Sequence, residues 1–135
     1  MGGGQRTAAL RALALVSGVY DLVLAVPMLF FAPAMASLMG APPPVPLVNA
    51  QLNGVFTLAL AAGYFWAARD VESRRGYLWV AGVLAKGLGA ALFVLDHFRQ
   101  GSPSTFLLFA ATDGTLAVIT AALLGVRRGA EGADS

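Results

Sequence analysis

Three charged side chains stand inside apolar segments of the chain: Asp21, Lys86 and Asp113. Each lies near the middle of a run of about 20 residues, the length that crosses a hydrocarbon core of about 30 Å. A lone charge at the bilayer centre costs about 2.5 to 3.5 kcal/mol or more. We therefore expect these three side chains to meet in the interior of a helical bundle, where Lys86 neutralises one carboxylate.

The second carboxylate decides what chemistry such a cluster could perform. In a dry interior it either holds a proton at neutral pH or receives a cation or the amine of a ligand. Ligand binding and proton transfer both fit that pattern. The alternative is structural, because a paired ion network can set the register of the helices without binding anything.

Two further polar groups belong to the predicted site. Asn49 and Asn53 are four residues apart, so they share one helix face and extend the polar core. His97 follows Lys86 by eleven residues, which returns it to the same helix face near the opposite membrane surface, beside Asp96. That pair forms either an outer mouth that passes protons or an interfacial pair that ends the helix.

Metal and cofactor chemistry find little support in the residue types. The chain has no cysteine and one histidine, which argues against thiolate or multi-histidine metal sites and against bis-histidine haem. The GLG segment at 87–89 lies inside an apolar run and lacks the context of a phosphate-binding loop. We predict neither a metal nor a cofactor.

Composition places these residues in a membrane. Hydrophobic residues make up 58% of the 135-residue chain and charged residues only 12%, against about 25% charged in soluble domains. The predicted fold is all-α, a single transmembrane four-helix bundle over 1–135, with helices at the apolar runs 8–31, 46–68, 77–98 and 104–126. Residues 34–45 are expected to form an interfacial turn and an extended proline segment.

Orientation follows from the positive charges. One side of the predicted spans carries a single arginine, Arg99, whereas the other carries seven: Arg6, Arg11, Arg69, Arg74, Arg75, Arg127 and Arg128. This bias predicts that both termini are cytoplasmic. The basic residues flank the spans and form no continuous patch, so nucleic acid is not an expected partner.

The first span has a rival interpretation. Two early arginines, an apolar stretch and AMA before Ser37 resemble a cleaved signal peptide. We favour a retained helix, because the stretch exceeds the usual h-region of about 7 to 15 residues and contains Asp21.

Two patterns describe how the spans pack and end. Aromatic residues near the predicted cytoplasmic interface suit a membrane belt: Tyr64, Trp66, Tyr77 and Trp79. The third span carries the small-xxx-small pairs Ala85 to Gly89 and Gly87 to Ala91, which predict close contact with a neighbouring helix.

The segments GVYDLVLAVPMLF, GVLAKGLGAALF and TDGTLAV, distributed over four spans, resemble small uncharacterised bacterial membrane proteins of the DoxX-like four-helix group. This resemblance covers nearly the whole chain and rests on hydropathy and a few residues. It implies a multi-pass protein of the bacterial inner membrane that acts as a membrane partner in redox or stress complexes. No functional motif of that group matches Asp21, Lys86 or Asp113, so no residue role is transferred.

Three functions follow from the predicted polar core. The first is a non-catalytic membrane protein that binds a small hydrophobic or lipid-like ligand or a partner subunit. The second is a small proton- or cation-coupled transporter, which with only four helices would have to work as a homo-oligomer. The third is an intramembrane enzyme using the two carboxylates as acid and base, although no nucleophile accompanies them.

The charge bias makes a testable prediction of topology. Tags at Met1 and Ser135 should both be accessible only from the cytoplasm, and a probe in the PPPVP segment at 42–46 only from outside. Labelling of intact and permeabilised cells measures this. A periplasmic C-terminus, or cleavage after Ala36, would contradict it.

Overall fold

The computed structural model describes residues 2–125, and within that range every regular element is a helix. In chain order these are α1 (Gly3–Phe30), α2 (Ala32–Leu38), α3 (Leu47–Arg69), α4 (Arg75–Tyr77), the π-helix η1 (Leu78–Ala85), α5 (Lys86–Gln100) and α6 (Phe106–Gly125). The elements α4, η1 and α5 follow one another without a break. The predicted all-α class is confirmed for the described residues.

The helices agree with the four apolar runs to within a few residues, apart from α1, which begins earlier. The predicted end of the last span at Val126 lies outside the described residues, as do Arg127 and Arg128. The segment after α1 differs from expectation, because Ala32–Leu38 forms a helix of its own with Pro33 in its first turn. Proline is tolerated there, since the N–H it lacks would have had no partner within the helix.

Three of the described helical segments are long and apolar enough to cross a membrane: Gly3–Phe30, Arg75–Gln100 and Phe106–Gly125. The 23-residue α3 is not among them. Its first turns carry the amides of Asn49, Gln51 and Asn53, which lower its hydropathy. By length and composition, the protein is therefore a helical membrane protein with three candidate spans.

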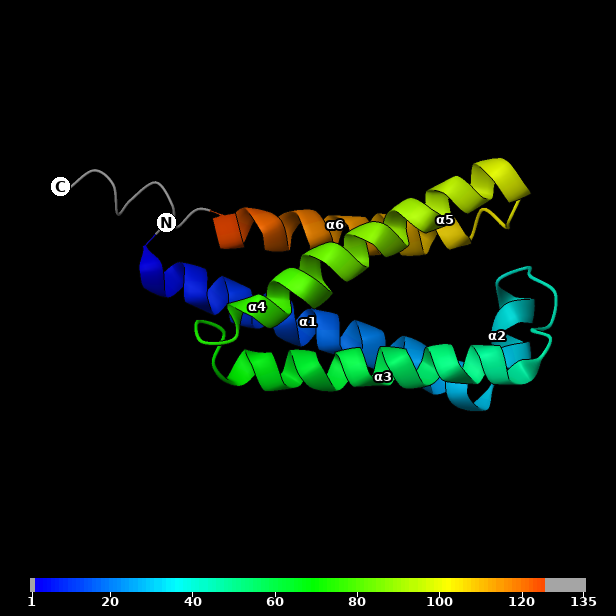
Figure 1. The fold of residues 1–135 in the computed structure, drawn as a ribbon, viewed down its shortest axis with the longest axis horizontal. Coiled ribbons are helices and arrows are strands. Elements are labelled where there is room, and N and C mark those ends of the chain that lie inside the picture. Colours follow the sequence, from blue (N-terminus) through cyan, green and yellow to red (C-terminus); the bar gives the residue numbers. More distant parts are fainter. Residues whose placement is uncertain (1, 126–135) are drawn as a thin grey trace.

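The long helices form two pairs (Figure 1). Helix α1 packs along α3, and α5 with η1 packs along α6. The pairs meet where α6 and η1 contact α1, and η1 also contacts α3. Close approach within the first pair depends on Gly54, where an added Cβ would lie 2.8 Å from Cγ of Leu29.

A hydrophobic core cluster of buried side chains lies at the η1 end of the molecule. It joins α1, α3, η1 and α6 through Leu10, Ala14, Tyr64, Ala67, Ala68, Val71, Leu78, Ala81 and Leu124. The prediction that Tyr64 belongs to a membrane belt is wrong, because this side chain is only 1% exposed and packs edge-on against Tyr77. Trp66 and Trp79, about half exposed, stay on the surface.

Three chain segments lie at this same end (Figure 1), and polar contacts link them. Glu72, in the turn after α3, accepts hydrogen bonds from Oγ1 of Thr7 at 2.8 Å and from Arg6 at 3.3 Å. Arg75 lies 3.4 Å from Glu72 and donates to the carbonyl of Leu124 at 2.6 Å. The start of α1, the 70–74 turn and the end of α6 are thereby linked.

Small residues of the third long helix contact α6, but not at all of the expected positions. An added Cβ at Gly82 would lie 3.0 Å from Thr120, and Ala90 lies opposite Gly114. Gly89, by contrast, has open space beside it. The expectation that the Ala85 to Gly89 pair packs closely on a neighbouring helix is therefore wrong. The small residues that contact α6 begin at Gly82, which lies inside the wider π-helical turns of η1.

Glu72→Gln should test the contacts at the η1 end. The Thr7 hydrogen bond, with help from Arg6, lowers the pKa of Glu72. A lowered folded-state pKa stabilises the fold above the unfolded-state pKa, and that contribution is lost as pH falls through the folded-state value. The parent should exceed Glu72→Gln in stability by less than about 1 kcal/mol at pH 7, with a gap that closes in acid.

Thermal unfolding in detergent between pH 7 and pH 3 measures that gap. Asp96→Asn is the matched control, because Asp96 is an exposed carboxylate of α5. A difference between parent and Glu72→Gln that stays constant over the whole pH range would contradict the prediction.

Candidate functional site

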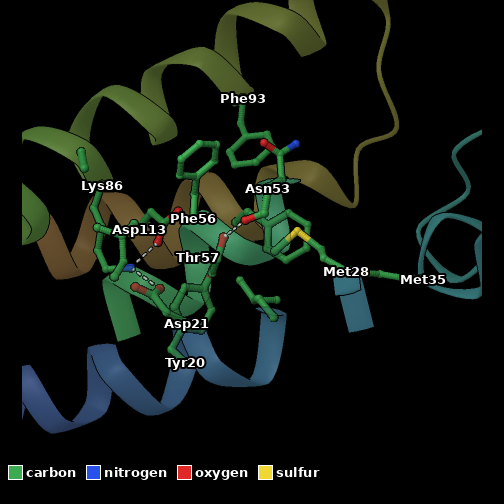
Figure 2. A pocket seen from close by; sticks show the side chains of 14 residues that line it. Tyr20, Asp21, Met28, Met35, Asn53, Phe56, Thr57, Lys86, Phe93 and Asp113 are labelled. Atoms are coloured by element: carbon green, nitrogen blue, oxygen red, sulfur yellow. Dashed lines mark hydrogen bonds and ion pairs between the residues drawn. The ribbon is translucent and has the colours of Figure 1, made fainter. Parts of the chain in front are cut away.

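The three intramembrane charges meet in one cluster, as the sequence predicts (Figure 2). Nζ of Lys86 donates to Oδ1 of Asp21 at 2.7 Å and to Oδ1 of Asp113 at 3.1 Å. The side chains of Lys86, Asp21 and Asp113 are 7%, 5% and 16% exposed, respectively. Because they come from α5, α1 and α6, the cluster joins the two helix pairs.

Aromatic rings complete the surroundings of the Lys86 ammonium. Its Nζ lies 4.9 Å from the ring centroid of Tyr20 and 5.6 Å from that of Tyr64. Both distances are within the range of cation–π attraction. Two carboxylates and two ring faces thus replace the water that a lysine side chain normally retains.

One carboxylate oxygen of this cluster is buried without a partner. Oδ2 of Asp21 forms no hydrogen bond with any described residue. Buried polar atoms are rarely left in that state, since an unmade hydrogen bond costs about 1 to 3 kcal/mol. This oxygen identifies the position in the site where a hydrogen-bond donor would be stabilised.

Tyr20 and Asp21 both line a cavity of about 380 Å³ between the two helix pairs. Its charged end is formed by the Lys86 cluster, and the rest of its wall is mainly apolar (Figure 2). The apolar wall comprises Leu24, Met28, Met35, Phe56, Leu60, Ala85, Phe93 and Phe109. Thr57 and Asn53 add two polar side chains from α3.

A second cavity of about 310 Å³ lies next to the first, toward α2. The two share the lining residues Met28, Met35, Asn53, Phe93 and Phe109. The second cavity adds the proline segment and Phe106, whose ring lies 6.0 Å from that of Phe93. A mainly apolar space therefore extends from the charged cluster toward the α2 end of the molecule.

The other predicted site residues divide between the cavity and the surface. Asn53 lines both cavities, whereas Asn49 is exposed near the start of α3 and lines neither. Asp96 is exposed, and Nδ1 of the half-buried His97 lies 2.7 Å from the carbonyl oxygen of Ser102. Neither lines these two cavities, and His97 instead closes the turn that ends α5 at Gly101.

Several lining residues were not singled out in the sequence, although helical spacing relates them to those that were. Met28 follows Asp21 by seven residues, and Phe93 follows Lys86 by seven. Phe109 precedes Asp113 by four residues, and Thr57 follows Asn53 by four. Residues four or seven apart share a helix face, so this spacing was the available signal.

Among residues 2–125 no group of three or more His, Cys, Asp or Glu side chains is arranged to hold a metal ion. The carboxylates of Asp21 and Asp113 are both engaged by Lys86. What the site presents is a charged end with one unsatisfied acceptor, and an apolar space beside it. That arrangement suits an amphipathic molecule.

Lys86→Leu tests the cluster. Removing the ammonium leaves two buried carboxylates without a counter-charge, and breaking a buried pair in this way costs about 3 to 5 kcal/mol. Combining it with Asp21→Asn or Asp113→Asn should restore part of the stability. We expect Asp21→Asn to rescue better, because its contact with Lys86 is shorter and more buried.

Thermal unfolding of the purified variants in detergent measures both effects. Arg11→Leu serves as the matched control, since Arg11 is an exposed basic residue of α1. A Lys86→Leu protein as stable as the parent would show that the cluster does not hold the helices together.

Comparison with protein-family models, with curated proteins and with solved structures gave no match to this chain. The DoxX-like resemblance therefore stays an expectation.

Proposed function

We propose that this chain is a non-catalytic, multi-pass membrane protein that binds a small amphipathic or lipid-like ligand in the cavity beside Lys86. The observation that carries the proposal is the division of one cavity into a charged end and an apolar wall. Its volume of about 380 Å³ falls within the range of about 300 to 1,000 Å³ that is typical of small-molecule sites.

The proposed membrane arrangement has four spans, with α3 as the fourth. Helix α3 packs along α1, and lining of the cavity by its residues argues that it enters the bilayer with its partner. Arg6, Arg69 and Arg75 lie in the segments that gather at the η1 end. By the positive-inside rule we propose that this end faces the cytoplasm of a bacterium, with both termini there.

The buried charges also support a second candidate function, that of a transporter. Ionisable residues within membrane spans often carry protons or ions, and a triad of such residues lines this cavity. A proton- or cation-coupled transporter would produce flux across proteoliposomes that Asp113→Asn abolishes. A binding protein would produce none.

Photolabelling tests the binding proposal directly. We expect a dodecan-1-ol that carries a diazirine on its chain to label Met28 and Phe93, and excess dodecan-1-ol to suppress that labelling. Thr57→Phe places a ring in the cavity and should reduce the labelling at least about tenfold. The hydroxyl lost in that variant bonds only to the carbonyl of Asn53 in its own helix, so the fold should be retained.

Val118→Phe is the matched control, because Val118 of α6 is 69% exposed and does not line the cavity. Its labelling should equal that of the parent. Labelling spread evenly over the exposed helix faces, and insensitive to Thr57→Phe, would contradict the proposed function.

A further inference from the structure

We propose that the ligand of this cavity is an amphipathic amine, bound as its ammonium ion with an N–H group donating to Oδ2 of Asp21. The inference rests on the proposed function, because it assigns the chemistry of the ligand's polar end. A neutral alcohol or an anionic fatty acid would be bound less well.

The first argument is geometric. Asp21 is only 3% exposed, and its two oxygens differ in their contacts. Oδ1 accepts from Lys86 at 2.7 Å, whereas Oδ2 is buried and has no partner among the described residues. An ionised carboxylate is an acceptor only, so the group that complements Oδ2 must be a hydrogen-bond donor.

The second argument is charge balance. The titratable groups near Asp21 are the ammonium of Lys86, the carboxylate of Asp113 and the phenols of Tyr20, Tyr64 and Tyr77. Two carboxylates thus share one ammonium, and the phenols add no positive charge. An ammonium ion in the cavity neutralises the excess, an alcohol leaves it unchanged, and a carboxylate increases it.

The apolar wall of the cavity determines the chemistry of the rest of the ligand. Beyond the charged end the cavity continues past Phe56, Phe93 and Phe109 and joins the second cavity at Met28 and Met35. None of these side chains is charged, so none could form an ion pair with a second polar group of the ligand. The unbranched methionines adapt to different shapes, so an alkyl or alicyclic body fits better than a polar one.

A proton is the competitor of this ammonium ion. Without ligand, the excess carboxylate is neutralised most simply by protonation. When the ammonium binds, one proton leaves the carboxyl group for the solvent and one positive charge enters, so the charge of the cluster stays balanced. Binding of an alcohol releases no proton.

The experiment compares dodecylamine with dodecan-1-ol, which have the same chain and differ in the polar group. An alkylamine is ionised at neutral pH, as lysine is. The full chain is placed in phosphatidylcholine nanodiscs, whose headgroup has no N–H donor, and each compound competes with the photoprobe. We expect dodecylamine to compete at least about tenfold better, and infrared spectra to lose a protonated-carboxyl band on its binding only.

Two variants locate the preference. Asp21→Asn and Asp113→Asn each leave Lys86 with one carboxylate, so the cluster is balanced and should fold. In both, the ratio between the two competitors should fall to about one. Asp70→Asn is the matched control, because Asp70 is an exposed carboxylate in the 70–74 turn, and it should leave the ratio unchanged.

The results separate the two proposals. Equal competition by dodecylamine and dodecan-1-ol in the parent overturns the amine assignment and leaves the binding function standing, whereas failure of both compounds overturns the function itself. Nanodiscs that also contain phosphatidylethanolamine distinguish two sources of the amine. Suppression of labelling by that lipid assigns a lipid headgroup, and unchanged labelling assigns a free amphipathic amine.

Discussion

The double ion pair of Lys86 is the interaction on which the rest of this structure depends. It is the point at which α1, α5 and α6 exchange polar contacts in the interior. Charged groups within membrane spans are rare and almost always face the bundle interior, where they pair. This double pairing requires all three helices at defined heights. A shift of one helix by a single turn, about 5.4 Å, would separate these atoms.

The geometry of the helix pairs explains why a cavity lies beside that cluster. The pairs are held together at the η1 end by the buried core and by the contacts of Glu72 and Arg75. Toward the α2 end of the molecule, helix α5 packs along α6 and helix α1 packs along α3 (Figure 1). Side chains that line the space between the pairs, such as Phe93 and Met28, fill it only in part.

The π-helix bears on the same site. Lys86 is the first residue after η1, so its direction depends on turns wider than those of an α-helix. π-Helical turns are rare and frequently occur at functional sites. Here the wide turns place Gly82 against Thr120 on α6 and bring Lys86 to face both carboxylates.

Hydropathy and charge alone were sufficient to predict the helical class, the approximate helix ranges and the meeting of Asp21, Lys86 and Asp113. The physical reason is that lipid offers no partner to a backbone amide or a charge, so length and charge position leave few alternatives. The place of Asn53 in the wall of the cavity was predicted by the same reasoning.

Other features depend on which face each helix turns inward, and no single segment contains that information. Tyr64 is buried instead of facing the interface, Asn49 lies outside the cavity, and Gly82 instead of Gly89 contacts α6. The buried oxygen of Asp21 that has no partner is another feature that depends on helix rotation. Only the tertiary structure decided these points, because helix rotation is set by packing between segments far apart in the sequence.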